Sequence, residues 1–306
     1  AKTNCKAMIN KMISPDGFQK ELIRELEIFN EIQSLRFPEE ETLIIDLHCH
    51  DYNSDVPDEI LGRILKVPET WLPTENLLKT LKKHGCTAYT VTNHNNGRTI
   101  WEQQEKGVDI LSAAEFSCFV PDFETGIHVL TYGFNQKQEK VLNKLRHNFY
   151  MFQEYANEHD LPTIWAHPLY NYSTKGIPPF EFYEKMALVF ERFEVLNGQR
   201  DTWQNMLVKE WVKSLVPEKI DELKAKFSLD LSRFCRDIYK KSMSGGSDSH
   251  MGIFSGLTGT KLYVPGLKNK VPVISTSELA LEAIRKGQMA PCGSLNNNEK
   301  MTVAFL

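Results

Sequence analysis

The chain has 306 residues, of which 41% are hydrophobic and 25% are charged. This length and composition suffice for one large α/β domain with a substantial core, and two domains are not required. The formal net charge of -4 provides no overall basic field, so bulk electrostatic binding to nucleic acid or to an anionic membrane is not indicated. The 6 cysteines are scattered and include no C-x-x-C pair, which fits a reducing compartment.

Membrane and secretion signals are the next features to consider. No apolar run approaches the roughly 18 residues that span a bilayer, and no signal-peptide pattern opens the chain. We therefore expect a cytoplasmic protein without a membrane partner. The chain begins with Ala1 rather than Met and ends in the apolar stretch 301–306, so whether it is a piece of a longer protein is left open.

Residues 1–40 are predicted to form an N-terminal helical arm that precedes a domain spanning 41–306. Pro15 suits a first helical turn, and Pro38 ends the pattern. The apolar residues between them repeat at helical spacing, namely Phe18, Leu22, Leu26 and Phe29. We expect this helix to pack on its own domain, the alternative being that it docks a partner or a second subunit.

An H-x-H pair follows the first predicted strand. Leu43 to Ile45 are apolar and partly β-branched, and His48-Cys49-His50 follows them after Asp46-Leu47. Residues two apart at a strand end point to the same side, so the two imidazoles can share a metal. Cys49 points to the opposite side and is interpreted as a packing residue.

Ligand-type residues recur after or within later strand-like runs. His94 follows 88–92, Glu115 follows 108–114, His128 lies inside 126–132, His167 follows 163–166, and Asp248 and His250 follow the glycine-rich stretch 244–247. Six of the 9 histidines fall at such positions. A repeated pattern of strand, ligand and helix predicts a parallel barrel with its catalytic residues at the C-terminal strand ends.

The intervening segments are predicted to be mainly helical. Residues 136–159 carry one long amphipathic pattern, and 276–286 form a capped helix. The segment 199–243 is long for a barrel connection, so it is predicted to be a helical insertion near the mouth of the site, with helical patterns at 217–227 and 229–239.

In order and spacing, these motifs resemble the PHP (polymerase and histidinol phosphatase) family of metal-dependent phosphoesterases. The stretches that carry the resemblance are His48-Cys49-His50 with Ser54-Asp55, Thr92-Asn93-His94-Asn95, Glu115, His128, His167-Pro168 and Gly246-Ser247-Asp248-Ser249-His250. The likeness covers roughly residues 42–293. It implies a distorted, seven-stranded (β/α) TIM-like barrel. Asn93 and Val56 depart from the family's usual Asp and Gly, and neither departure removes a ligand.

The resemblance also implies three divalent metal ions. The first would be held by His48, His50, Glu115 and Asp248, the second by Asp55, His94 and His250, and the third by Glu115, His128 and His167, with Glu115 bridging. Imidazole and carboxylate ligands independently favour Mn²⁺, Fe²⁺ or Zn²⁺ over Ca²⁺. Asp46 and Asn93 are expected to orient the histidines rather than to bind metal.

Such a site predicts hydrolysis of a phosphate ester. Three divalent ions outweigh the carboxylates Asp55, Glu115 and Asp248, which favours a phosphoryl group, and the expected nucleophile is a hydroxide that bridges the ions. The expected substrate is a phosphomonoester or phosphodiester of a small molecule or nucleotide, or a nucleic-acid end. Substrate-binding cations are expected among Arg98, Lys175 and Arg200, with Arg200 favoured.

Two other functions stay open at this point. An amidohydrolase-type metal hydrolase also begins with H-x-H on a barrel strand, but it usually ends in a lone Asp, whereas here His250 follows Asp248 closely. A regulatory or non-catalytic PHP-like module, part of a larger protein, would bind metal without turnover. Turnover of a generic phosphoester separates that module from an enzyme.

Overall fold

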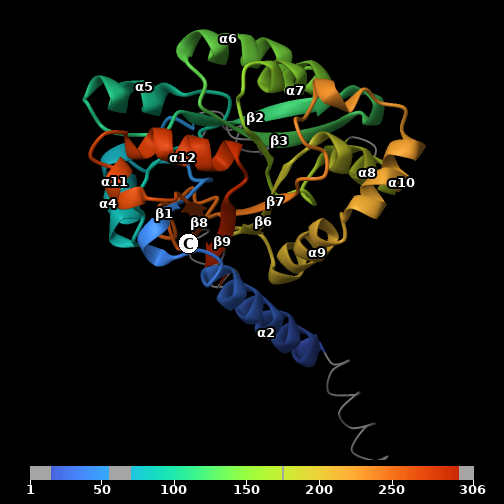
Figure 1. Ribbon diagram of the computed structural model, residues 1–306, viewed down its shortest axis with the longest axis horizontal. Coiled ribbons are helices and arrows are strands. Elements are labelled where there is room, and N and C mark those ends of the chain that lie inside the picture. The colour runs from blue at the N-terminus through green and yellow to red at the C-terminus, as the bar shows by residue number, and fades with distance from the viewer. Residues whose placement is uncertain (1–14, 55–69, 174–175, 296–306) are drawn as a thin grey trace, which may run out of the picture.

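The molecule is a mixed α/β body from which one long helix projects (Figure 1). The computed structural model describes residues 15–54, 70–173 and 176–295. Two predicted site residues, Asp55 and Lys175, lie outside the described residues, as does Val56. The body contains two sheets, of three and six strands.

The smaller sheet carries the first candidate ligands. It joins β1 (Thr42–Ile45), β8 (Thr258–Tyr263) and β9 (Met289–Gly293) in the order β1-β8-β9, and both pairs are antiparallel. β1 is the predicted first strand, and its exit leads directly into His48 and His50.

The larger sheet is mixed. Its main path runs β2 (Ala113–Val120), β3 (Thr125–Tyr132), β4 (Thr163–Trp165), β6 (Arg192–Asn197) and β7 (Ser242–Gly246), and β5 (Tyr172–Ser173) pairs with β3 beside this path. The β4/β6 and β6/β7 pairs are parallel, whereas the β2/β3, β3/β4 and β3/β5 pairs are antiparallel.

The prediction of one parallel, closed barrel is therefore wrong for the described residues. β2 and β3 are joined only by residues 121–124, and so short a connection reverses the chain, because a parallel pair needs a crossover of a dozen or more residues. The predicted strand 88–92 contributes only one bridge, between Thr90 and Leu111. Single bridges also join Cys49 to Ser249 and His94 to Glu115, so these segments pair at isolated points rather than through continuous ladders.

Helices cover the sheets on the outside (Figure 1). Their bounds in chain order are α2 Pro15–Ser34, α4 Thr74–Lys83, α5 Arg98–Glu105, α6 Gln136–Leu145, α7 Phe149–Glu158, α8 Phe180–Val189, α9 Thr202–Lys213, α10 Pro217–Lys226, α11 Leu267–Lys270 and α12 Thr276–Arg285. Short 3-10 turns lie at Glu39–Glu41, Pro121–Phe123 and Leu231–Arg233.

The described residues form three hydrophobic clusters, and two of them pack against the sheets. The larger one packs α7, α8 and α9 against the six-stranded sheet, and Trp165 on β4 contacts Phe182 of α8 and Phe193 of β6. The second contains side chains of both sheets, such as Ile45 and Leu130, and is closed by Ile284 of α12. Burial of each large apolar side chain contributes about 1.5–3 kcal/mol, so the interior holds the two sheets together without a closed ladder.

Two helix predictions need correction. The pattern at 136–159 forms two helices rather than one, because the side chain of Asn148 accepts hydrogen bonds from the backbone N–H groups of Tyr150 and Met151 and so starts α7 afresh. The pattern at 229–239 contains only the 3-10 turn Leu231–Arg233, whereas α9 occupies the earlier part of the segment 199–243.

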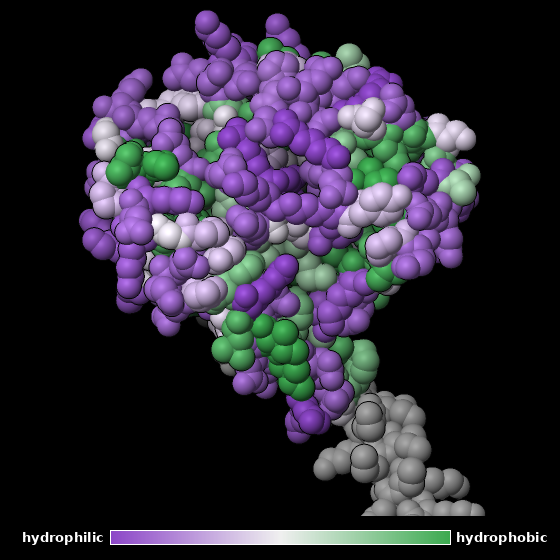
Figure 2. Space-filling view, in the orientation of Figure 1, coloured by the Kyte–Doolittle hydropathy of each residue, from purple (hydrophilic) through white to green (hydrophobic). Residues whose placement is uncertain are grey.

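The projecting helix α2 agrees with the helix predicted from the spacing of its apolar residues. It packs against β9 and α9 through the buried side chains of Leu26 and Phe29. Ile28 and Ile32 on this helix, and Leu35 just after its end, are exposed, and the face shown in Figure 2 has apolar surface over this helix. None of the described helices is long and apolar enough to span a bilayer.

Candidate metal centre

Glu115 lies at the centre of five imidazoles. Its Oε1 is 2.8 Å from Nδ1 of His128 and 3.1 Å from Nε2 of His167. Its Oε2 is 3.2 Å from Nε2 of His48, 3.3 Å from Nε2 of His50 and 3.3 Å from Nδ1 of His94. The carboxylate is 1% exposed, so a single buried acid joins histidines from five places in the sequence.

The sheet register explains how β2 and β3 bring two of these groups together. Glu115 is opposite Leu130, and Ser117 is opposite His128, so Glu115 and His128 are diagonal neighbours on one face of the hairpin. Glu115 is the third residue of β2, so it does not follow a strand end as predicted, whereas His128 lies within β3 as the run 126–132 indicated.

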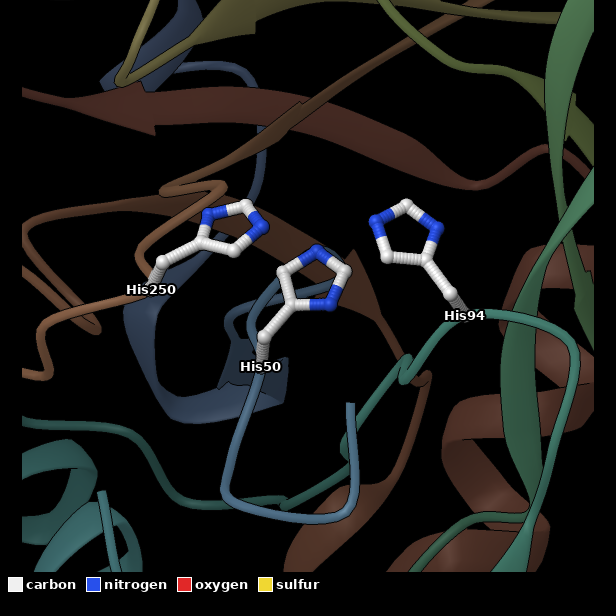
Figure 3. Close-up of side chains that lie close together, drawn as sticks. All are labelled: His50, His94 and His250. Atoms are coloured by element: carbon white, nitrogen blue, oxygen red, sulfur yellow. The ribbon is translucent and has the colours of Figure 1, made fainter. Parts of the chain in front are cut away.

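The remaining histidines come from strand exits and loops. The backbone N–H of Ala166 donates to the carbonyl of His128, which places His167 beside it. The exit of β1 runs alongside the exit of β7, because Asp248 N–H donates to the His48 carbonyl and His50 N–H to the Ser249 carbonyl. Figure 3 shows His50, His94 and His250 reaching one another from three separate segments.

Asp248 is the second carboxylate of the cluster. Its Oδ1 lies 3.5 Å from Nε2 of His48 and 3.5 Å from Nε2 of His50. Four groups of three side chains bring their ligand atoms within 4.8 Å of one another: His48, His50 and Asp248; His50, His94 and His250; His48, Glu115 and His167; and His94, Glu115 and His128. Every predicted ligand among the described residues therefore belongs to one cluster that can hold metal ions.

The predicted division of these ligands among three ions remains a prediction. Glu115 contacts both His128 and His167, as expected of the third set, and it also contacts His94, which was assigned to the second. The geometry therefore brings the three predicted sets into contact around Glu115 rather than separating them.

Burial and neighbouring charges set the ionisation of the cluster. Burial raises the pKa of Glu115, but the imidazoles of His48, His128 and His94 outweigh it and hold that pKa well below its usual range. Burial lowers the pKa of His48, yet Glu115, Asp248 and Glu194 raise it well above its usual value. The cluster therefore favours the ionised form of Glu115 and a positive charge at the His48 ring.

The atoms around His48 provide a test of whether a cation fits. Nδ1 of His48 is 3.0 Å from Oε1 of Glu194, a geometry in which the ring donates its Nδ1 proton to that carboxylate. In neutral imidazole the buried Nε2 then carries a lone pair, and Nε2 makes no hydrogen bond to any of the described residues. It faces carboxylate oxygens of Glu115 and Asp248, which are acceptors as well. Acceptors directed at one another need a shared proton or a shared metal ion, and the set of imidazole and carboxylate donors fits a metal ion.

Local backbone strain occurs at two of the candidate ligands. His167 and Asp248 have φ values of 29° and 51°, a region that costs a non-glycine residue about 1–3 kcal/mol. Gly246, just before this turn, has no room for a side chain, because a Cβ atom there would lie 2.4 Å from Cβ of His48 and 2.9 Å from Oε1 of Glu194. The strained backbone and the close packing at Gly246 therefore both occur where the candidate ligands converge.

Glu194 was not predicted as a site residue. It is buried in β6, where Oε1 accepts from His48, and Oε2 accepts from the His167 backbone N–H at 2.9 Å and from the Asn197 side chain at 2.9 Å. Asn197 also donates to Oδ2 of Asp248 at 3.0 Å. A carboxylate between Phe193 and Val195, in a run whose other residues from 193 to 196 are apolar, is the signal that identifies Glu194 from the sequence.

The predicted support of the histidines is confirmed for Asp46 at the His48 backbone and is indirect for Asn93. Asp46 accepts from the backbone N–H groups of His48, Ser247 and Gly256, so it fixes the chain around the histidines and not their rings. Asn93 pairs with Asp51, accepting from its N–H at 3.0 Å and donating to its carboxylate at 2.6 Å. Cys49 is fully buried in an apolar cluster, which confirms its interpretation as a packing residue.

The predicted substrate-binding cations occupy different surroundings. Nη2 of Arg200 is 3.6 Å from Oδ2 of Asp248, its guanidinium carbon is 3.8 Å from the centroid of the Tyr170 ring, and its side chain is 24% exposed. Arg98 is exposed at the start of α5, where it donates to the Asn53 carbonyl and the Asn96 side chain. Arg200 is thus placed beside the cluster.

Comparison with known proteins adds information on the fold. No family model matches the chain, and no curated protein matches its sequence. Among solved structures, PsfC from Pseudomonas syringae PB-5123 matches with a TM-score of 0.51 at 13% identity, covering 87% of this chain and 97% of that chain. At this identity the match shows a shared fold alone.

Two other solved structures are less similar. One, from Bifidobacterium adolescentis, is assigned as a metal-dependent phosphoesterase and gives a TM-score of 0.39 at 12% identity over 68% of this chain and 88% of that chain. The other, an amidohydrolase from Chromobacterium violaceum, gives 0.42 at 12% identity over 78% and 96%. These likenesses are too weak to carry an argument. Membership of the PHP family therefore stays a prediction, and the chain shares its fold with PsfC.

Proposed function

We propose that this chain is a metal-dependent hydrolase that cleaves phosphate esters. The observation that carries the proposal is the buried carboxylate of Glu115 at the centre of five imidazoles. A cluster of this kind costs stability unless its acceptors share protons or metal ions, so a functional reason for its presence is expected. Imidazole with carboxylate favours Mn²⁺, Fe²⁺ or Zn²⁺.

The residues that would hold the ions are His48, His50, His94, Glu115, His128, His167, Asp248 and His250. Asp55, outside the described residues, is proposed as a further ligand. Divalent ions bound there would lower the pKa of water toward roughly 7 and offset negative charge on the substrate. Glu194 fixes the His48 ring through Nδ1 and the His167 backbone through its N–H, so it sets the orientation of two ligands at once.

The charge of the site favours a phosphoryl group as the substrate. Two divalent ions already carry more positive charge than Glu115, Asp248 and Glu194 carry negative charge, so the loaded site would attract an anion. Arg200 adds a guanidinium at its edge, and its buried Nε has no hydrogen-bond acceptor among the described residues. A phosphate oxygen is an acceptor that matches this donor.

Hydrolysis itself would form a bond between a water oxygen and phosphorus and break the bond between phosphorus and the ester oxygen, which then takes a proton. Most of the cluster is buried, whereas the His250 side chain is 26% exposed and marks the side from which solvent reaches it. Burial strengthens the interactions of the fixed groups with a charged substrate.

The experiment is a screen of the purified chain with added Mn²⁺, Zn²⁺ or Fe²⁺ against phosphomonoesters, phosphodiesters, oligonucleotides and a set of amides. Metal-dependent release of phosphate or cleavage of a diester is expected, and its loss in His50→Ala. Arg200→Ala should raise KM at unchanged metal stoichiometry, with Arg98→Ala as the matched control. Cleavage of the amides alone, or metal binding without turnover of any substrate, would contradict the proposal.

A further inference from the structure

A continuous line of planar side chains runs from Arg200 to the cluster. The guanidinium carbon of Arg200 lies 3.8 Å from the Tyr170 ring centroid, and the Tyr170 and Tyr172 rings meet edge to face at 5.3 Å and 88°. Tyr172 in turn lies 5.0 Å from the ring of His128, and Tyr170 lies 5.7 Å from that of His167. Two tyrosines therefore border the candidate ligands on the same side as the cation.

The backbone holds Tyr172 at this place. It belongs to β5, the two-residue strand that pairs with β3, where it lies opposite Gly126. A Cβ atom at Gly126 would lie 3.2 Å from Cβ of Tyr172 and 3.4 Å from its carbonyl oxygen, tighter than ordinary contact. The absence of a side chain at Gly126 thus lets the tyrosine pack close to β3, next to His128 two residues further along that strand.

Tyr172 differs from Tyr170 in its exposure. Tyr172 is 37% exposed, whereas Tyr170 is half-buried between Arg200, His167 and Tyr172. Large aromatic surface that stays exposed beside a candidate centre is available for contact with a ligand. Aromatic side chains stack with planar rings of many kinds, because the interaction depends on the π-face rather than on a particular hydrogen-bond pattern.

We infer that Tyr172 selects phosphate esters whose alcohol portion carries a planar aromatic ring, and this inference rests on the proposed function. The anionic end of such a molecule matches Arg200 and the metal-loaded cluster, and its ring matches the exposed surface of Tyr172 next to them. The simpler role of Tyr172 is to pack against His128 and steady it. That role affects all ligands of the cluster equally, whereas selection of an aromatic ring changes the ratio between two ligands.

Two phosphonates separate these roles, because they resist hydrolysis and differ only in the ring. Benzylphosphonate carries a planar aromatic ring, and cyclohexylmethylphosphonate carries a saturated ring of similar size. Calorimetric titration of the Mn²⁺-loaded chain is expected to show about tenfold tighter binding of the benzyl compound, within the range that stacking on an aromatic side chain reaches. Tyr172→Phe should keep this ratio, and Tyr172→Leu should bring it close to one.

Mn²⁺ titration of each variant is the control for loss of the centre itself. Equal affinities of the parent protein for the two phosphonates, no binding of either, or a preference that persists in Tyr172→Leu would overturn the inference. Turnover of benzyl phosphate is measured separately. Selective binding without turnover contradicts the proposed reaction but supports recognition of the ring. Turnover without selectivity supports the proposed reaction but contradicts recognition of the ring.

Discussion

Asp51 and Glu115 are two buried carboxylates with contrasting surroundings. Asp51 is fully buried and accepts hydrogen bonds from the hydroxyls of Thr74 and Thr99, the Asn93 amide and the Asn53 N–H. Glu115 is equally buried, but the contacts described above for its two side-chain oxygens are all with imidazole nitrogens. A complete set of neutral donors stabilises Asp51 without a cation.

The difference separates a buried acid that is fully hydrogen-bonded within the chain from one whose surroundings still lack a partner. The Asp51 network ties the loop after His50 to the starts of α4 and α5 and to Asn93, the residue before His94. It needs nothing from outside the chain. The Glu115 cluster leaves at least one buried nitrogen, Nε2 of His48, without a hydrogen bond, so this cluster is completed only by a proton or a metal ion.

The largest expected effect is that of Glu115→Gln. The change removes the charge on which five imidazoles converge while keeping the side-chain shape. Because residues that merely orient metal ligands are worth 10–100-fold in metal affinity, we expect a loss of at least about a hundredfold here. Calorimetric titration with Mn²⁺ and Zn²⁺ measures it, and circular dichroism checks the fold. Unchanged affinity in a folded variant would show that Glu115 binds no metal.

Asp51→Ala tests the other side of the comparison. Removal of this carboxylate leaves buried hydroxyl and amide donors without an acceptor, at a cost of about 2–4 kcal/mol in the free energy of unfolding. Urea denaturation without added metal measures this cost. At temperatures where the variant is folded, the number of bound metal ions per chain should equal that of the parent. A drop in metal stoichiometry with little change in stability would place Asp51 in the metal centre.

Metal addition should raise the free energy of unfolding of the parent protein by about as much as Asp51→Ala lowers it. An ion that binds only the folded chain contributes about 2.7 kcal/mol at a hundredfold excess over its dissociation constant. Thermal unfolding with EDTA and with Mn²⁺ checks this expectation. Asp51→Ala should retain the stabilisation and Glu115→Gln should lose most of it. Identical midpoints for the parent protein in EDTA and in Mn²⁺ would contradict the existence of the site.

The smallest effect is expected for Glu194→Gln. Glu194 is not one of the proposed ligands but orients His48, so the substitution should weaken metal binding by about 10–100-fold and leave the stoichiometry unchanged. Metal titration against the parent measures the change. Loss of a whole ion from the chain would instead assign Glu194 as a ligand.

Much of the candidate site could be predicted from the sequence, because the type of a residue determines which metal-binding atoms its side chain offers. His48, His50, Glu115 and Asp248 meet in the structure as their types and order indicated. β1 and α12 were likewise predictable, since a short β-branched run and a capped amphipathic repeat are local signals.

Only the tertiary structure decided which strands pair and which side chains support the ligands. The antiparallel β2/β3 hairpin places Glu115 and His128 on one face, and no periodicity in either strand specifies its partner. Glu194 reaches His48 across 146 residues of sequence, and Asp51 meets Asn93 across 42. Contacts at such separations depend on packing of the whole chain, whereas the identity of a metal ligand depends on one side chain. For this reason the sequence determined the chemistry of the centre, and the fold determined its geometry.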